Sequence, residues 1–239
     1  MRKIINLLLV IFIFQSAVAQ NTISDPNVEK RNITGFHAIS VSSGIDLILV
    51  QGDEAVAVSA SELKYRDRIQ TEVKEGVLKI WYEHENRNFN ISFRNIKLKA
   101  YVSCKTLDGL KASGGSDIVI NGVIKTGRLD LSISGGSDIR GKMEATDLKA
   151  TASGGSDIML SGIAQSVYIH TSGGSDFKGT DFIVENCFID ASGGSDVSIT
   201  VNKELSVEAT GGSDVHYKGT GLIRDIKNSG GGSIKRITR

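Results

Sequence analysis

Six aspartates recur at nearly even spacing through the second half of this 239-residue chain, each closing a Gly-Gly-Ser-Asp tetrapeptide. Repeated carboxylates are groups that could hold a hard cation such as Ca²⁺, which takes oxygen ligands. Successive copies are 21, 19, 19, 20 and 18 residues apart. The six residues are Asp117, Asp138, Asp157, Asp176, Asp196 and Asp214. Identical tetrapeptides at this interval indicate a repeating structural unit.

Two weaker copies flank these six. Ser233 stands 19 residues after Asp214, where the next aspartate would be, and follows three glycines. An earlier copy is arguable at Ser43-Gly44-Ile45-Asp46. The repeat could therefore extend beyond the stretch in which it is regular.

The paired glycines predict a sharp corner in each unit. Such a corner needs a positive φ or a close approach of neighbouring backbones, and only glycine supplies these without a Cβ penalty. Serine and aspartate beside them are expected to hydrogen-bond local backbone amides. The corner glycines are Gly114, Gly115, Gly135, Gly136, Gly154, Gly155, Gly173, Gly174, Gly193, Gly194, Gly211 and Gly212.

Stacking one aspartate over the next carries an electrostatic cost. At a separation of about 4.8 Å, two charges repel by about 0.9 kcal/mol in bulk water and about 3.5 kcal/mol at an effective dielectric of 20. The six carboxylates must therefore be solvated, bonded to amide or hydroxyl donors, or neutralised by cations. Two interpretations stay open: hydrated corner residues, or a Ca²⁺-binding column.

Other residues capable of chemistry form no recognisable site. No histidine has a metal-ligand spacing, and all four are expected at the surface: His37, His84, His170 and His216. Cys104 and Cys187 are 83 residues apart and are interpreted as buried structural thiols, with a disulfide or a nucleophile as the alternative. The chain has neither a Gly-x-Ser-x-Gly elbow nor a phosphate-binding loop. No catalytic residue and no cofactor is therefore predicted.

The residues between the corners alternate with a period of two, which is typical of strands. In one unit the apolar Leu129, Leu131 and Ile133 enclose the polar Asp130 and Ser132, and the other units repeat this order. The residue after each aspartate is apolar without exception: Ile118, Ile139, Ile158, Phe177, Val197 and Val215.

A unit of about 19 to 20 residues cannot bury its apolar face alone, but stacked units can. The expected fold is all-β, a right-handed parallel β-helix whose coils pair in parallel. A β-propeller is the alternative, and it would need two units per blade. A leucine-rich horseshoe lacks support, because neither its asparagine ladder nor its helical return is visible.

The first half carries strand-like runs without the regular glycines. Residues 61–68 could add a helical turn capped by Ser61, and residues 83–95 are the expected protruding loop. The runs are 36–41, 45–50, 55–60, 77–82 and 96–102.

The extreme N-terminus has the layout of a secretory signal peptide, with basic Arg2 and Lys3, an apolar stretch and small residues before Gln20. We expect a signal peptide at 1–19, a linker at 20–32, and a β-helix at 33–239 with irregular coils to 105 and repeat coils from 106. A net charge of +1 gives no reason to expect nucleic acid or anionic lipid as a partner. No second apolar run is long enough to span a membrane.

Taken together, the leader, the Ser-Gly-Ile-Asp-Leu segment at 43–47, the strand at 77–82 and the Ser-Gly-Gly-Ser-Asp repeats resemble the bacterial head GIN domain family, described as autotransporter adhesins. The resemblance covers the chain from about residue 33 onward. It implies a β-helical fold, export from a bacterial cell, and no established enzymatic activity.

The expected function is that of an exported, non-enzymatic solenoid, which serves in adhesion or as an envelope scaffold. A Ca²⁺-stabilised module is one alternative, and a polysaccharide-active enzyme built on the irregular first half is another. The compartment is the periplasm, the outer-membrane surface or the medium. A cell-surface protein, a glycan and a second copy of the chain stay open as partners.

Overall fold

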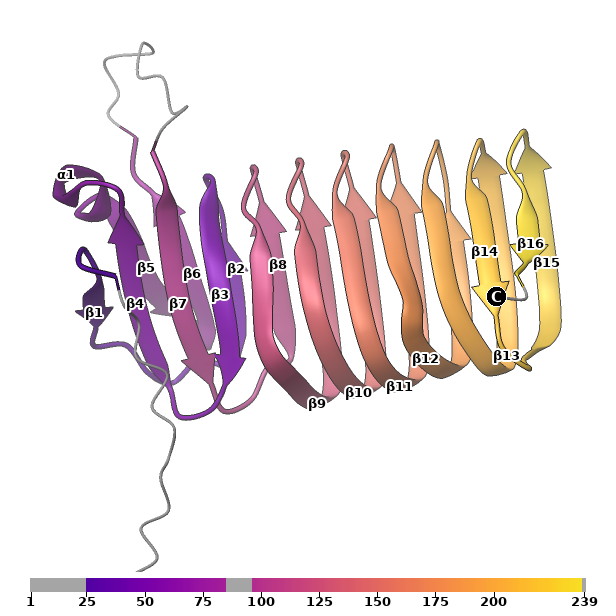
Figure 1. Cartoon of the computed structure of the whole chain (residues 1–239), viewed down its shortest axis with the longest axis horizontal. Coiled ribbons are helices and arrows are strands. Elements are labelled where there is room, and N and C mark those ends of the chain that lie inside the picture. The colour runs from indigo at the N-terminus through magenta and orange to yellow at the C-terminus, as the bar shows by residue number, and fades with distance from the viewer. Residues whose placement is uncertain (1–24, 85–95, 238–239) are drawn as a thin grey trace, which may run out of the picture.

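Alternating side chains form long strands that stack in parallel. The computed structural model describes residues 25–84 and 96–237, which form a parallel β-solenoid of about seven turns (Figure 1). Each long strand bends midway, so that every coil has two sides (Figure 1). The long strands are β9 (Ile118–Ser134), β10 (Ile139–Ser153), β11 (Asp157–Ser172), β12 (Asp176–Ala191) and β13 (Asp196–Gly211).

The stacking places equivalent residues of successive units side by side. Ile139 pairs with Ile118 on one side and with Ile158 on the other, and Phe177 pairs with Val197. The apolar residue after each repeat aspartate is buried, with at most 1% of its surface exposed. The predicted parallel solenoid and its apolar columns are confirmed; the right-handed sense of the coil stays a prediction.

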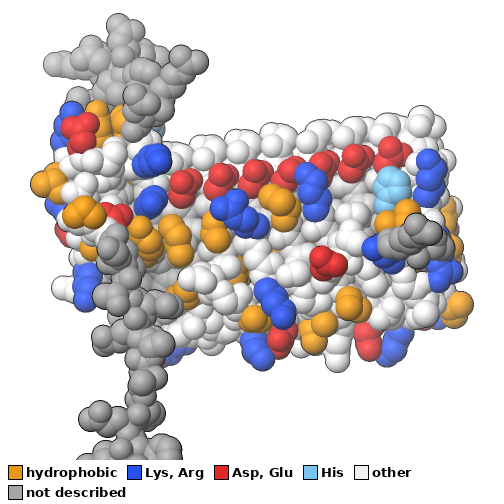
Figure 2. All heavy atoms as spheres, viewed as in Figure 1, with side chains coloured by type: hydrophobic (Ala, Val, Ile, Leu, Met, Phe, Trp, Pro, Cys, Tyr) orange, Lys and Arg blue, Asp and Glu red, His pale blue; other side chains and the backbone are white. Residues whose placement is uncertain are grey.

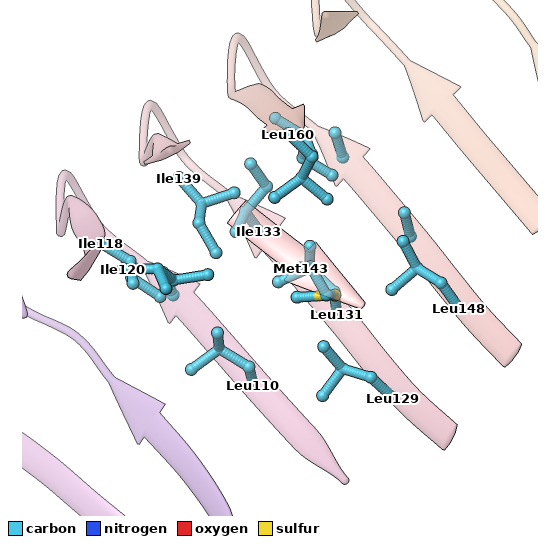
Figure 3. Close-up of a cluster of buried hydrophobic side chains, with 14 of the residues drawn as sticks. Leu110, Ile118, Ile120, Leu129, Leu131, Ile133, Ile139, Met143, Leu148 and Leu160 are labelled. Atoms are coloured by element: carbon cyan, nitrogen blue, oxygen red, sulfur yellow. The ribbon is translucent and has the colours of Figure 1, made fainter. Parts of the chain in front are cut away.

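The interior is a dry layer between the two sides of each coil. Side chains from before and after the bend meet there, including Leu131, Met143 and Leu148 (Figure 3). Each aliphatic row runs through several coils, as Leu110, Leu131, Ala150 and Ile169 do in direct register. Burial of these rows stabilises the stack, because each Å² of apolar surface that is removed from water contributes roughly 25 cal/mol.

The first half does not stack in chain order. β3 (Ile45–Gln51) lies between β7 (Leu98–Cys104) and β9. On the other side of the coil, β2 (Ala38–Val41) lies between β6 (Val77–Tyr82) and β8 (Gly109–Ser113). The expectation that consecutive segments lie directly over one another is therefore wrong here, because the coil at 38–51 is inserted between two later ones.

Antiparallel strands cover the N-terminal end of the stack (Figure 1). β4 (Ala55–Ala60) pairs with β7 and with β1 (Glu29–Arg31), while β5 (Ile69–Lys74) pairs with β6. The short helix α1 (Leu63–Arg66) connects β4 to β5. Its N-cap residue is Glu62, which makes no side-chain capping bond, so the prediction of Ser61 as the cap was wrong.

The last coils continue the solenoid at the opposite end. β14 (Asp214–Lys218) and β15 (Leu222–Gly230) both pair with β13, and β16 (Ile234–Arg236) pairs with β14. Ile234 extends the apolar column from Val215, as the degenerate seventh copy predicts. Of the other expectations, the signal peptide at 1–19 and most of the loop at 83–95 lie outside the described residues. No helix in the described part of the chain is long and apolar enough to cross a bilayer.

Candidate functional site

The repeat aspartates form a ladder along one edge of the solenoid. The aspartate ladder consists of Asp46, Asp117, Asp138, Asp157, Asp176, Asp196 and Asp214, and acidic side chains form a row along this edge in Figure 2. The amide of Asp138 donates to Oδ1 of Asp117 at 3.1 Å, and the amide of Asp157 donates to Oδ1 of Asp138 at 3.0 Å. The carboxylates therefore bond amides of the next coil, whereas the sequence suggested local amides.

Both weaker copies of the repeat join this ladder. The carboxylate of Asp46 accepts a hydrogen bond from the amide of Asp117, although the two residues are 71 apart in sequence. At the other end, Oδ1 of Asp214 accepts from the amide of Ser233 at 2.8 Å and from its hydroxyl at 2.7 Å. The ladder thus begins at Asp46 in the first half of the chain and ends at Ser233 in the weaker C-terminal copy of the repeat.

The two ends of the ladder differ in their ionisation. Burial raises the pKa of Asp46, and the charge of Asp117 raises it further. The hydroxyl and the amide of Ser233 lower the pKa of Asp214. At Asp46, burial and repulsion by Asp117 therefore both oppose ionisation, whereas at Asp214 the donors of Ser233 favour it.

The ladder is interrupted at two steps. The amides of Asp176 and Asp214 donate to the carbonyl oxygens of Ser156 and Ser195, at 3.2 and 3.1 Å, instead of to a carboxylate. At the first of these steps Lys178 bridges the two acids, with Nζ 2.6 Å from Asp157 and 3.1 Å from Asp176. At this step the Lys178 ammonium group therefore contacts the Asp157 carboxylate, which at other steps is the role of a backbone amide.

A second ladder is buried beneath the first. The serine ladder consists of Ser116, Ser137, Ser156, Ser175, Ser195 and Ser213, all fully buried. The Oγ atoms of Ser137, Ser156 and Ser175 each accept the amide of the ladder serine one coil earlier, at 3.0 to 3.2 Å. Where both ladders are intact, the carboxylate bonds the following coil and the serine Oγ bonds the preceding one, so corners such as those at Asp138 and Asp176 are fixed from both sides.

The corner glycines fall into two groups. The first glycine of every pair has a positive φ, as at Gly193 with 77°, where a Cβ would also lie 2.8 Å from the carbonyl oxygen of Gly173. Among the second glycines, Gly174, Gly194 and Gly212 lie outside the left-handed region and have no contact closer than 3.5 Å at a Cβ position. Neither conformation nor close approach explains these three glycines.

No metal centre is apparent among the residues that the structure describes. No group of three or more histidine, cysteine, aspartate or glutamate side chains converges there. The ladder carboxylates are spread along an edge and take amide, hydroxyl and ammonium donors. The geometry is that of a structural column, with single carboxylates facing solvent between coils.

The first face of the solenoid carries a shallow groove beside the aspartate ladder. This face consists of the outward residues between each aspartate and the bend, and in Figure 2 basic and hydrophobic side chains lie on it beside the acidic row. The groove has a volume of about 610 Å³ and runs across β9 to β12. Val119, Met159 and Leu160 line it together with Arg140 and Lys142. It is an open hollow with apolar and cationic walls.

The second face consists of the outward residues between the bend and the glycine corner, and it carries an aromatic pair. Tyr168 on β11 and Phe188 on β12 stack with their ring centroids 5.4 Å apart and an interplanar angle of 4°. Next to them, Nδ1 of His170 lies 2.9 Å from Oδ2 of Asp190. Asp190 also accepts a hydrogen bond from the Tyr168 hydroxyl. The sequence placed these residues outward, but the cluster appears only when the units are aligned by register.

The remaining candidates form no site. His37 pairs with Asp108 at 2.7 Å, and the ring of His84 contacts Tyr82 edge to face. Cys104 and Cys187 are both free and buried, as the structural interpretation predicts. Burial raises the pKa of each thiol, to about 11 at Cys104. Neither sulfur is therefore a thiolate at neutral pH, which argues against a nucleophilic role.

Solved structures from Bacteroides and Parabacteroides species have the same fold. A "putative adhesin" from Bacteroides fragilis superposes with a TM-score of 0.78 at 20% identity, covering 88% of this chain and 96% of that chain. Another from Parabacteroides merdae gives a TM-score of 0.70 at 18% identity, covering 89% and 96%. A "putative lipid binding protein" from Parabacteroides distasonis gives 0.65 at 21% identity, covering 90% and 98%. These similarities establish the fold.

Sequence comparison places the chain in a family. No curated protein matches it. Residues 35–221 match the sequence profile of the family described as "Putative auto-transporter adhesin, head GIN domain". This span includes the inserted coil, the antiparallel strands β4 and β5, and all six Gly-Gly-Ser-Asp corners. The chain therefore belongs to the head GIN domain family.

Proposed function

We propose that this protein is an exported, non-enzymatic binding module that attaches to a component of a cell surface through the outer faces of its solenoid. The observation that carries the proposal is the rigid stack itself. The two ladders bond most corners to neighbouring coils, and both faces present polar side chains in rows. Such a surface is preorganised, so little conformational entropy is lost when a partner binds.

The distribution of chemical groups supports binding over catalysis. The groove on the first face is shallow and open, whereas catalytic sites enclose the substrate and exclude water. Among the residues that line this groove, Asp181 is the one carboxylate, so the lining holds no pair of carboxylates. The description of the family as adhesins agrees with a surface role. Export to the periplasm, the outer-membrane surface or the medium is part of the proposal.

Binding of the purified mature chain to intact cells tests the proposal. Labelled protein is titrated onto cells of the producing bacterium, and alanine variants of each face are compared with the parent. Arg140→Ala with Lys142→Ala probes the first face, and Tyr168→Ala with Phe188→Ala probes the second. We expect saturable binding that at least one pair weakens while the melting temperature is kept. Binding that no outward substitution changes would contradict the proposal.

A further inference from the structure

The second face holds a cluster that the aspartate and serine ladders do not use. Tyr168 and Phe188 are 37% and 40% exposed, which is high for rings of this size. Their side chains lie in direct register on adjacent coils. Because the two rings are parallel and lie on adjacent coils, the planes of both rings are roughly perpendicular to the solenoid axis. One face of each ring is therefore covered by the other ring.

The face of the Phe188 ring that points away from Tyr168 lies next to a small side chain. Its neighbour on the next coil is Ser206, whose side chain is too short to cover an aromatic ring. The neighbour of Tyr168 on the other side is Lys149, which is long enough to lie over the phenol. The row thus reads Lys149, Tyr168, Phe188, Ser206, with a gap above the serine that one ring face borders.

Polar groups line both sides of this row. On one side lie His170 and Asp190, which are joined at 2.9 Å and have about one third of each side chain exposed. On the other side Ser166 and Asn186 pair in register, and neither side chain is hydrogen-bonded within the described part of the chain. Imidazole, carboxylate, hydroxyl and amide groups thus surround a flat apolar surface.

We propose that the second face binds a neutral glycan, with a pyranose ring stacked on Phe188 above Ser206. This inference rests on the proposed binding function and specifies its ligand class. A sugar ring has an apolar C–H face and a rim of hydroxyls, which match the aromatic surface and the polar groups on both of its sides.

The surrounding charge selects the kind of glycan. Glu208 follows Asp190 in register, and Asp225 follows Ser206. Lys227 follows Glu208 and lies 3.7 Å from Asp225, so three carboxylates and one lysine surround the gap. Uronic acids and sulfated sugars would meet like charges there, which disfavours their binding. Neutral hexoses and pentoses meet acceptors for their hydroxyl donors. A neutral polysaccharide is therefore the ligand that this face fits.

Affinity electrophoresis of the full mature chain tests the inference. The protein is run in native gels that contain galactomannan, xylan or dextran as neutral probes, and alginate as an anionic probe. We expect at least one neutral probe to retard the protein and alginate to leave its mobility unchanged. Phe188→Ala is expected to weaken the retardation at least about tenfold, as loss of one stacking contact does elsewhere.

Two further variants make the test specific. Ser206→Leu keeps every group of the cluster but fills the gap beside Phe188, and it should abolish retardation without changing the melting temperature. Ile183→Ala removes an exposed apolar side chain from the same strand as Phe188, outside the cluster, and should bind as the parent does. Absence of retardation by all three neutral probes, or equal retardation of Ser206→Leu and the parent, overturns the inference. Cell binding that persists in that case leaves the proposed function standing.

Discussion

The amide nitrogen of Asp157 donates a hydrogen bond to Oδ1 of Asp138 at 3.0 Å, across a separation of 19 residues in sequence. The carboxylate of Asp138 would repel that of Asp157, but through this contact it also accepts a hydrogen bond that holds the next coil in register. The charge of Asp138 is thus offset by a backbone dipole of the adjacent coil, as is the charge of every other ladder residue except Asp157 and Asp196. The repeat needs an acceptor at this position, and aspartate supplies one short enough to reach a single coil.

This arrangement predicts that calcium contributes nothing to stability. If the chain had one calcium site, Ca²⁺ at a hundred times the dissociation constant would add about 2.7 kcal/mol to the free energy of unfolding. That would raise the melting temperature by roughly 5 to 10 °C for a chain of this size. We expect identical melting curves in millimolar CaCl₂ and in excess chelator. Magnesium serves as the matched control ion. A calcium-specific increase that Asp138→Asn removes would instead support the Ca²⁺-stabilised alternative.

Replacement of Ser175 by alanine should be the most costly change in the serine ladder. Its Oγ accepts the amides of Gly155 and Ser156, at 3.2 and 3.1 Å, and alanine leaves both without that acceptor. We expect a loss of about 1–3 kcal/mol in the free energy of unfolding, measured by urea titration. Ser195→Ala is the control, because the Ser195 hydroxyl donates to the carbonyl of Ser192. Equal losses in the two variants would refute the role of the ladder as an acceptor of amides.

Adjacent glycines at one corner should respond differently to alanine. Gly193→Ala forces a left-handed φ of 77° and places Cβ 2.8 Å from the oxygen of Gly173. The conformational penalty alone is about 1–2 kcal/mol. Gly194→Ala meets that oxygen at 3.8 Å and lies outside the left-handed region, so it should be neutral or slightly stabilising. Thermal melts of the two variants provide the comparison, and a larger loss at Gly194 would show that this account of the corner is wrong.

Asp46 and Asp214 should give opposite pH dependences. The folded state raises the pKa of Asp46, so ionisation opposes folding and its cost appears as pH rises through the folded pKa. The stability of Asp46→Asn relative to the parent should therefore increase with pH. The folded state lowers the pKa of Asp214, so its contribution is present above the unfolded pKa and is lost as pH falls through the folded value. The relative stability of Asp214→Asn should decrease with pH.

Urea titrations of the parent and both variants, from roughly pH 3 to pH 7, measure these differences. Asparagine keeps an oxygen acceptor at each position, so the comparison isolates the charge. Curves for the two variants with the same sign of slope would contradict the assignment of burial to one end and hydroxyl donation to the other.

The regular half of the fold was predictable because its information is local. A single period holds the alternation of Leu129, Leu131 and Ile133, the glycine corner and the aspartate, and repetition gives the register. The strands at 55–60 and 77–82 could also be predicted, because each is a local run of strand-forming residues. The coil at 38–51 is different, since its position between β6 and β8, and between β7 and β9, depends on pairing across tens of residues.

The candidate site was predictable only in part. The positions of the aspartates could be predicted. That their carboxylate oxygens accept amides of the next coil could not, because no local sequence pattern distinguishes an amide one coil away from one in the same turn. His170 was expected at the surface, and the period-two alternation puts Tyr168, Phe188 and Asp190 at outward positions as well. Their convergence follows only from writing the units one above another. That alignment was available from the sequence and would have indicated the cluster.

The two ladders have a consequence for how such proteins vary. The corners at Asp117 and Asp138 make the same serine and aspartate bonds to the coil on each side, so a period of this kind can be removed or duplicated and the new neighbours still match. Excision of residues 139–157, for example, would join Asp138 to Ile158 and preserve the spacing of all later corners. Length becomes an adjustable property, and the area available for contact can grow or shrink in whole steps while both ends of the rod stay the same.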